Sequence, residues 1–150
     1  MTNKINKILK ELKTTLGNEV WMVFGGYNLK LQGLNYQTND IDIYTTLNGL
    51  SKIKKKYKCT FKCGYNWAGV DFRIKRQEFQ AISEELSTKS YYSKYLNKRG
   101  IKSIKLGNIT IPCLKLENQI RGYQAVMKAG KGSTDPKNKI VLIRKYLSKS

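Results

Sequence analysis

"FGGYNLKLQGLNYQTNDIDIYTT", residues 24–46, is the stretch that decides the fold of this sequence. The apolar run "EVWMVF" at 19–24 leads into it and predicts a buried strand. The two glycines predict a turn that opens a short helix. The strict alternation of "DIDIYT", residues 40–45, predicts a second strand with one polar and one apolar face. The stretch therefore predicts a strand–turn–helix–strand unit.

Asp40 and Asp42 form the polar face of the second predicted strand. Residues i and i+2 of a strand point to the same side, so the two carboxylates project together while Ile41 and Ile43 face the core. Such neighbours repel each other and stay ionised at low cost only when a cation lies between them. The chain contains no histidine, which excludes imidazole metal sites and histidine-based catalysis. Oxygen ligands alone favour Mg²⁺ or Mn²⁺.

A third aspartate lies in "GVDFRIK", residues 69–75. The alternation of this segment places Asp71 and Arg73 on one face of a strand, opposite the apolar residues. If this strand pairs beside residues 40–45, we expect Asp71 to join the other two carboxylates on one polar face. Three carboxylates at a sheet edge can hold two metal ions for phosphoryl or nucleotidyl transfer.

The glycines and the residues after them are candidate contacts to a nucleotide. Gly25 and Gly26 let the backbone approach a phosphate closely, and the start of a helix favours anions. A triphosphate would then lie between this turn and the strand that bears the metal. Lys30, one turn into the helix, and the pair Thr38 and Asn39 are further candidate phosphate or sugar contacts.

Each of these features also has a plainer interpretation. A Gly-Gly pair is more often a simple turn, and a lone Asp-x-Asp is usually an exposed strand face. Asp71 on its own is equally consistent with a cross-strand pair to Arg73 or to a lysine. The order of the features favours a site, because a strand, Gly-Gly, a short helix, Asp-x-Asp and a third strand aspartate follow one another.

Length and charge limit the class of protein. A chain of 150 residues, 40% of them hydrophobic, predicts one domain over residues 1–150 with one core. Its 29 Lys and Arg against 10 Asp and Glu give a net charge of +19. That charge indicates a polyanionic partner or ligand. The alternative is a lysine-rich composition with no binding role.

The cysteines and the N-terminus indicate where the chain resides. An odd count of three cysteines, Cys59, Cys63 and Cys113, argues against a disulfide framework. The segment "MTNKINKILKELK" is too charged for a signal peptide, and no apolar run approaches membrane-spanning length. We therefore expect a cytoplasmic protein with reduced cysteines and no membrane partner.

Periodicity and turn residues predict the remaining elements. Helices are expected at 5–16, 27–34, 49–58, 76–86, 115–129 and 137–147, and strands at 19–24, 40–45, 58–63, 69–75 and 101–114, the last a hairpin turning at 106–108. Asp135 or Thr134 is the expected cap of the last helix, with Pro136 at its first position. No element is predicted for 87–99. The result is an α+β (α/β-like) domain, a small mixed sheet flanked by helices, with a C-terminal helical part.

This arrangement resembles the nucleotidyltransferase superfamily of the DNA polymerase β type. The similarity is closest to small members with the signature GG-x-A…G-x-x-R-x-T-x-D-I-D-L, a group that includes antibiotic nucleotidyltransferases and the nucleotidyltransferase toxins of abortive-infection and toxin–antitoxin systems. Asp71 matches the third family carboxylate by its strand context. The residues in register with the signature are Gly25, Gly26, Gly33, Thr38, Asp40 and Asp42.

The C-terminal half resembles the same family less specifically. "ITIPCLKLENQI", residues 109–120, is similar to the strand and helix start that follow the family's catalytic core. The end of the chain resembles the family ending R-x-K-D…D-L, with Lys128 or Lys131 and Asp135 as counterparts. The resemblance therefore extends over residues 20–150, but only residues 24–43 are specific to the family.

Three positions depart from the family pattern. Tyr36 stands where the family has arginine, Tyr27 where it often has alanine, and Lys139 where the ending has its second aspartate. None of these changes alters the three carboxylates. They bear instead on which nucleotide and which acceptor the site accepts.

The resemblance implies transfer of a nucleoside monophosphate from an NTP to a hydroxyl group, with pyrophosphate leaving. Asp40 and Asp42 would hold the Mg²⁺ or Mn²⁺ that grips the triphosphate. Asp42 and Asp71 would hold a second metal ion, and Asp71 would help to deprotonate the acceptor. The metals would stabilise the attacking and leaving oxygens.

The charge of the chain favours RNA, such as the end of a tRNA, as the acceptor. Lysines cluster at 52–58, 89–105 and 128–149. The segment "YYSKYLNKR" at 91–99 combines tyrosines that could stack on bases with cations that could hold phosphates, or its tyrosines pack on the domain instead. Aminoglycosides are polycations, for which a +19 protein is a poor host.

Two other functions stay open on the sequence. The first is a nucleotidyltransferase that modifies a small molecule or a protein side chain. The second is a catalytically silent, basic nucleic-acid-binding protein with the same fold. A chain of this size also leaves room for a homodimer or a partner protein to complete the cleft.

Overall fold

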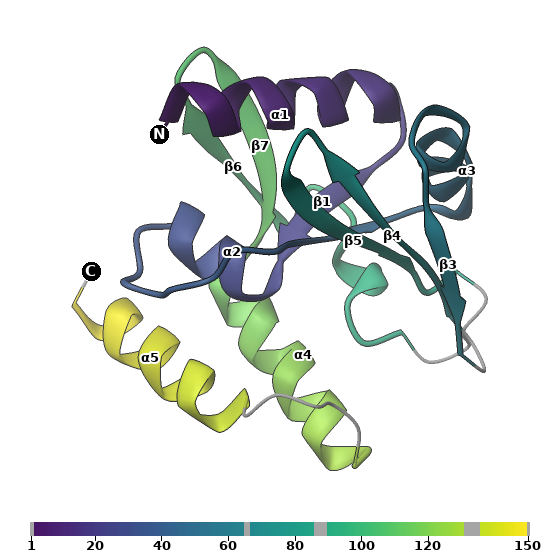
Figure 1. The fold of residues 1–150 in the computed structure, drawn as a ribbon. Coiled ribbons are helices and arrows are strands. Elements are labelled where there is room, and N and C mark those ends of the chain that lie inside the picture. Colours follow the sequence, from purple (N-terminus) through teal and green to yellow (C-terminus); the bar gives the residue numbers. More distant parts are fainter. Residues whose placement is uncertain (1, 65–66, 86–89, 131–135, 150) are drawn as a thin grey trace.

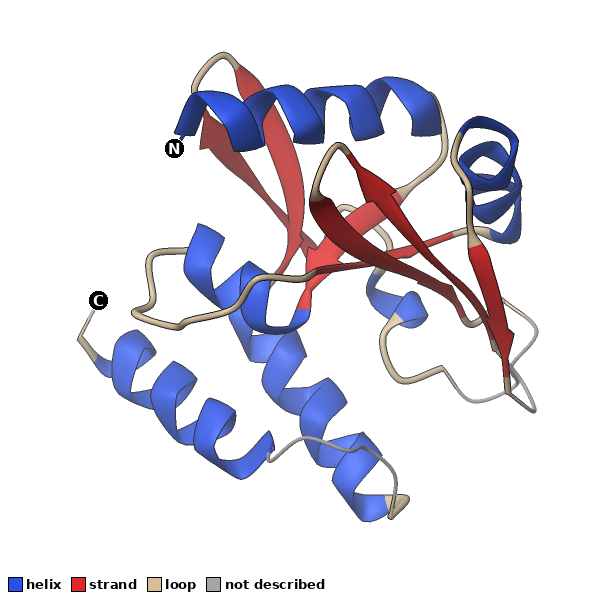
Figure 2. Cartoon of the chain, viewed as in Figure 1, coloured by secondary structure: helices blue, strands red, loops and turns tan. Residues whose placement is uncertain are grey.

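The centre of the molecule is a mixed β-sheet with helices on both faces (Figures 1 and 2). The computed structural model describes residues 2–64, 67–85, 90–130 and 136–149. Its strands are β1 (Trp21–Phe24), β2 (Ile41–Thr45), β3 (Thr60–Cys63), β4 (Ala68–Ile74), β5 (Gln77–Ser83), β6 (Ile101–Leu106) and β7 (Ile109–Leu114). Its helices are α1 (Thr2–Leu16), α2 (Gly25–Leu31), α3 (Leu47–Lys56), α4 (Leu116–Lys128) and α5 (Pro136–Ser148), with a 3₁₀ turn at Ser93–Tyr95.

The strands follow the order β3-β4-β5-β2-β1-β7-β6 across the sheet. β2 is antiparallel to β1 and parallel to β5, and β1 is parallel to β7. The hairpins β3–β4, β4–β5 and β6–β7 complete the sheet. β2 therefore lies at the middle of the sheet, and its start is the point where Asp40 and Asp42 emerge.

Both faces of the sheet are buried, which explains the continuous apolar run of β1. Trp21 and Val23 point into one hydrophobic cluster, shared with α1 and α3. Met22 and Phe24 point into the other, shared with α4 and α5. Figure 1 shows α1 and α3 on one side of the sheet and α4 and α5 on the other. Two-sided burial removes the alternation that a half-exposed strand would show.

Most predicted elements are confirmed, and one is wrong. Residues 76–86 were expected to form a helix, but 77–83 form β5. Lys75 has φ 56°, which reverses the chain after β4 into a tight hairpin. Phe79 and Ala81 then enter the core, while Glu78 and Gln80 face the other way. Pairing with strands on both sides outweighs the helix propensity of Glu, Gln and Ala in this segment.

The last helix begins at Pro136, as predicted, whereas its expected cap at Thr134 or Asp135 lies outside the described residues. No helix among the described residues has both the length and the apolar character that a membrane crossing requires.

Candidate active site

A row of side chains crosses the sheet from β2 to β3. Asp42 is paired in register with Gln80, Gln80 with Asp71, and Asp71 with Thr60. Side chains that are opposite each other on neighbouring strands share a face. Asp71 therefore lies on the same face as Asp42, as expected, but β4 is not the direct neighbour of β2. Since β5 intervenes, the backbones of Asp42 and Asp71 are two strand spacings apart, about 10 Å.

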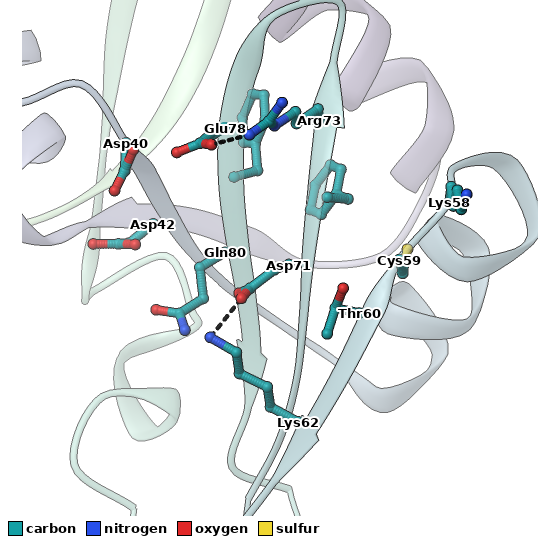
Figure 3. A pocket seen from close by; sticks show the side chains of 12 residues that line it. Asp40, Asp42, Lys58, Cys59, Thr60, Lys62, Asp71, Arg73, Glu78 and Gln80 are labelled. Atoms are coloured by element: carbon teal, nitrogen blue, oxygen red, sulfur yellow. Dashed lines mark hydrogen bonds and ion pairs between the residues drawn. The ribbon is translucent and has the colours of Figure 1, made fainter.

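A pocket of about 670 Å³ lies over this row. Figure 3 shows Asp40 and Asp42 on one side of it, Asp71 on the other, and Gln80 between them. Asp40 belongs to the segment just before β2, and Asp42 to the strand itself. Glu78 of β5 adds a fourth carboxylate beside Asp40. The three predicted aspartates therefore line one cavity.

The surroundings of Asp40 and Asp42 disfavour negative charge. The pKa of Asp42 is raised to about 6, mainly by burial and then by the nearby charge of Asp40, while Lys139 opposes this shift. Burial also raises the pKa of Asp40, followed by a hydrogen bond to Glu78 and its charge. Two such oxygen ligands suit one divalent cation such as Mg²⁺ or Mn²⁺, which would relieve the repulsion.

Asp71 is already paired with a cation. Lys62 of β3 lies 2.5 Å from its carboxylate, and Arg73 pairs with Glu78 in the same way (Figure 3). Among the residues that the structure describes, no three acidic, histidine or cysteine side chains lie close enough to hold one metal ion together. The donor set fits one cation at Asp40 and Asp42. A second cation at Asp71 would require Lys62 to move.

The glycine turn packs directly against this site. Gly25 has φ +72°, and a Cβ there would lie 2.9 Å from Oδ2 of Asp42. A Cβ on Gly26 would lie 2.7 Å from Cε1 of Tyr36. Only glycine allows β2 and the start of α2 to approach so closely. The turn is thereby fixed beside the carboxylate most affected by burial.

The other predicted nucleotide contacts lie elsewhere. Lys30, Thr38 and Asn39 line a second cavity of about 420 Å³ between α1 and α2. Thr38 also approaches the position that a Cβ of Gly26 would take, so it touches the glycine turn. Lys128 is exposed at the end of α4, and Lys131 lies outside the described residues.

The tyrosines of 91–99 pack on the domain. Tyr92 is buried, with its ring centroid 5.2 Å from that of Phe24 and 5.1 Å from that of Tyr44. Tyr91 and Tyr95 pack partly buried against the same cluster. The carboxylate of Glu84 accepts hydrogen bonds from the backbone N–H groups of residues 91–93 and fixes this loop. In this arrangement Tyr92 is not accessible for stacking on a base.

Several solved structures that share this fold are described as nucleotidyltransferases or as nucleotidyltransferase-like. A candidate nucleotidyltransferase from Thermotoga maritima matches with 20% sequence identity and a TM-score of 0.61, over 99% of this chain and 95% of that one. The antibiotic-resistance factor ANT(2'')-Ia matches with 11% identity and a TM-score of 0.62, over 98% of this chain and 86% of that one.

A nucleotidyltransferase-like protein from Paracoccidioides brasiliensis matches with 12% identity and a TM-score of 0.54, over 95% of this chain and 74% of that one. The chain has the nucleotidyltransferase fold. No protein-family model matches the sequence, and no curated protein matches it. Because these structures have at most 20% identity to the chain, the likeness concerns the fold.

Four side chains of this nucleotidyltransferase fold were not among the predicted site residues. Glu78 and Gln80 were missed because 76–86 was interpreted as a helix, although the alternation of 77–83 places them on one face of a strand. Lys62 was assigned to a strand, but its contact with Asp71 depends on the register of β3 with β4. Lys139 was noted only as a departure from the family pattern, and no sequence signal placed it near Asp42.

Proposed function

We propose that this protein is a metal-dependent nucleotidyltransferase that moves a nucleoside monophosphate from an NTP to a hydroxyl group of RNA. One observation carries the proposal. Asp40 and Asp42 share a pocket with Asp71, and Asp42 lies directly against the Gly25 turn. The nucleotidyltransferase fold supports the same conclusion.

The reaction is an in-line displacement at the α-phosphorus of the NTP. The acceptor hydroxyl oxygen forms a bond to this phosphorus, and the bond from the phosphorus to the oxygen that bridges to the β-phosphate breaks. Pyrophosphate leaves with that oxygen, and the hydroxyl proton passes to the carboxylate of Asp71. Lys62 holds that carboxylate in place from β3. Asp40 and Asp42 would hold a divalent cation, which would supply Lewis-acid stabilisation of the phosphate oxygens.

The net charge of the chain, +19, favours an anionic acceptor. Lys58, Lys62 and Arg73 line the pocket together with the carboxylates. Apart from the three aspartates, the one carboxylate among the described lining residues is Glu78, which is paired with Arg73. With a divalent cation on Asp40 and Asp42, no carboxylate among these lining residues would be left unpaired for a polycationic acceptor. A structure of ANT(2'')-Ia, one of the similar proteins, contains adenylyl-2''-tobramycin. Tobramycin is the acceptor in that complex, and the pocket charges of the present chain do not suit it.

Incubation with α-labelled NTPs and Mg²⁺ tests the proposal. Total RNA, total protein and tobramycin serve as three separate acceptors. We expect label on RNA, and we expect Asp42→Asn to lower labelling by at least about 100-fold. Gln124→Asn, on the exposed side of α4, is the matched amide control and should leave labelling intact. Label on protein or tobramycin instead would show that the acceptor is wrong.

The ion pair of Asp71 with Lys62 favours a second candidate function. A carboxylate held by a lysine is less available to a metal ion, as in a catalytically silent RNA-binding protein. That candidate predicts RNA binding that survives Asp40→Asn, with no transfer of label to any acceptor. This outcome would exclude the enzyme.

A further inference from the structure

Two of the departures from the family pattern lie against each other in the fold. Lys139 of α5 stands where the pattern has aspartate, and Tyr36 stands where it has arginine. The Nζ atom of Lys139 lies 5.6 Å from the centroid of the Tyr36 ring. It lies 5.6 Å from the centroid of the Tyr123 ring as well. The ammonium group is thus held by two aromatic faces, a geometry that attracts cations.

Both rings are connected to the glycine turn. The ring of Tyr36 fills the space beside Gly26 that a Cβ would need. The hydroxyl of Tyr123 accepts a hydrogen bond from Nε2 of Gln119, which also donates to the carbonyl oxygen of Gly25. Lys139 is therefore positioned relative to the turn through two independent contacts.

The charge of Lys139 reaches the carboxylate site. Its ammonium group lies over the ring of Tyr36, which fills the space beside Gly26, and the preceding Gly25 packs against the carboxylate of Asp42. No ion pair joins Lys139 to a carboxylate within the described part of the chain. Aromatic faces hold an ammonium group without cancelling its charge, so Lys139 keeps a full positive charge beside the glycine turn.

We propose that Lys139 binds the triphosphate of the NTP and supplies, from α5, the positive charge that position 36 lacks. The proposal rests on the proposed function and adds a nucleotide-binding residue to it. Asp71 and Lys62 lie on the β4 side of Asp42, whereas the glycine turn, Tyr36 and Lys139 lie on its other side. This arrangement separates an acceptor side from a triphosphate side.

Equilibrium binding of a non-hydrolysable NTP analogue with Mg²⁺ tests the proposal without relying on turnover. Removal of a charge-assisted hydrogen bond typically weakens binding by about 10- to 100-fold. We expect Lys139→Gln to weaken analogue binding by that factor and to raise KM for NTP similarly, while KM for RNA stays unchanged. Lys139→Arg should retain most of the affinity. Lys145→Gln, an exposed lysine later on α5, is the matched control and should bind normally.

A second variant tests whether Lys139 supplies the positive charge that position 36 lacks. Tyr36→Arg, added to Lys139→Gln, returns a cation to the loop and should recover part of the lost affinity. A double variant that melts like the wild type and stays weak would contradict this role of Lys139. Melting temperatures of all variants establish that they fold.

The possible outcomes distinguish the role of Lys139 from the proposed nucleotidyltransferase function on which it rests. If the wild type binds no analogue, the proposed function fails. If the wild type binds and Lys139→Gln binds equally well, or if only KM for RNA rises, the role of Lys139 is wrong while nucleotidyl transfer stands.

Discussion

Asp42 is a carboxylate in surroundings that disfavour its charge. Four effects act on it: burial and the charges of Asp40 and Asp71 raise its pKa, and Lys139 lowers it. Charged groups placed at such a cost are typical of functional sites, where a ligand supplies the missing compensation. At the residue scale, the ionised carboxylate of Asp42 should therefore lower the free energy of unfolding of the metal-free protein, compared with the same protein carrying a neutral side chain at this position.

The stability of the metal-free protein should fall as pH rises from about 4 to about 6. The pKa of Asp42 is about 6 in the fold against an ordinary value of 3.8, so the native state holds more protons than the unfolded state in this window. Unfolding free energy decreases with pH wherever the native state binds more protons. Asp42→Asn removes this dependence, and its melting temperature should exceed that of the wild type by a few degrees above pH 6, roughly 5 °C.

The comparison requires melting curves of both proteins from pH 4 to pH 7. The advantage of Asp42→Asn should be near zero at pH 4 and largest above pH 6. Mg²⁺ at pH 7 should raise the melting temperature of the wild type and not that of the variant. A difference that is constant across the whole pH range would show that Asp42 titrates normally.

Gly25→Ala should damage both stability and activity. The left-handed backbone at φ +72° costs a side chain roughly 1–2 kcal/mol. The new methyl group would also displace the carboxylate of Asp42, for a total loss of about 2–4 kcal/mol. Gly130→Ala is a close control because Gly130 has φ +67° and no atom of the described residues lies within 4 Å of the position its Cβ would take. Chemical denaturation and NTP turnover measure the two effects, and equal losses in both variants would contradict a role for the contact.

At the scale of elements, the sequence predicted what short-range patterns determine. The Asp40–Ile43 alternation and the glycines located β2 and the start of α2 because strand periodicity and turn chemistry are local. β5 was missed because its Glu, Gln and Ala favour a helix until β2 and β4 pair on both sides of it. Strand order is also non-local, and for that reason the spacing of Asp42 and Asp71 required the structure.

A buried hydrogen-bond network joins α2, β7 and α4 and holds the glycine turn. Nδ2 of Asn28 donates to the carbonyl oxygen of Leu114 and to Oε1 of Gln119. Gln119 in turn donates to the carbonyl oxygen of Gly25 and to the hydroxyl of Tyr123. These polar groups are satisfied by one another, so the elements are fixed in one arrangement. The network connects helix packing to the position of the site.

Gln119→Leu should destabilise the protein by about 2–4 kcal/mol. It removes the side-chain donor to the buried Gly25 carbonyl oxygen and one hydrogen-bond partner of Asn28. NTP affinity should fall as well, since Gly25 and Tyr123 lose their tether. Gln124→Leu, on the exposed side of the same helix, is the control and should change stability by less than about 0.5 kcal/mol. Denaturant titration decides the matter, and equal losses for the two variants would show that the network contributes little.

At the scale of the whole molecule, charge and aromatic residues have different roles. The tyrosines of 91–95 stabilise the domain, with Tyr92 buried beside Phe24 and Tyr44. The proposed recognition of RNA would therefore depend less on stacking at this segment than on the net charge of +19. Contacts of that kind attach to the phosphate backbone and carry little sequence information.

The KM for RNA should consequently rise steeply with salt, while the KM for NTP should change little. A protein that contacts 6–10 phosphates loses roughly 10³–10⁵ in affinity between 50 and 200 mM salt. We expect the KM for RNA to rise by at least about 100-fold over this range, and the loss to be much smaller for a dinucleotide acceptor, which offers few phosphates. Both constants are measured in the same labelling assay at each salt concentration.

The dinucleotide acceptor is the control. It separates screening of the RNA contacts from a general effect of salt on the site, because the NTP and the carboxylates are the same in both reactions. A KM for RNA that rises no more than that for the dinucleotide would mean that the positive surface does not hold the acceptor.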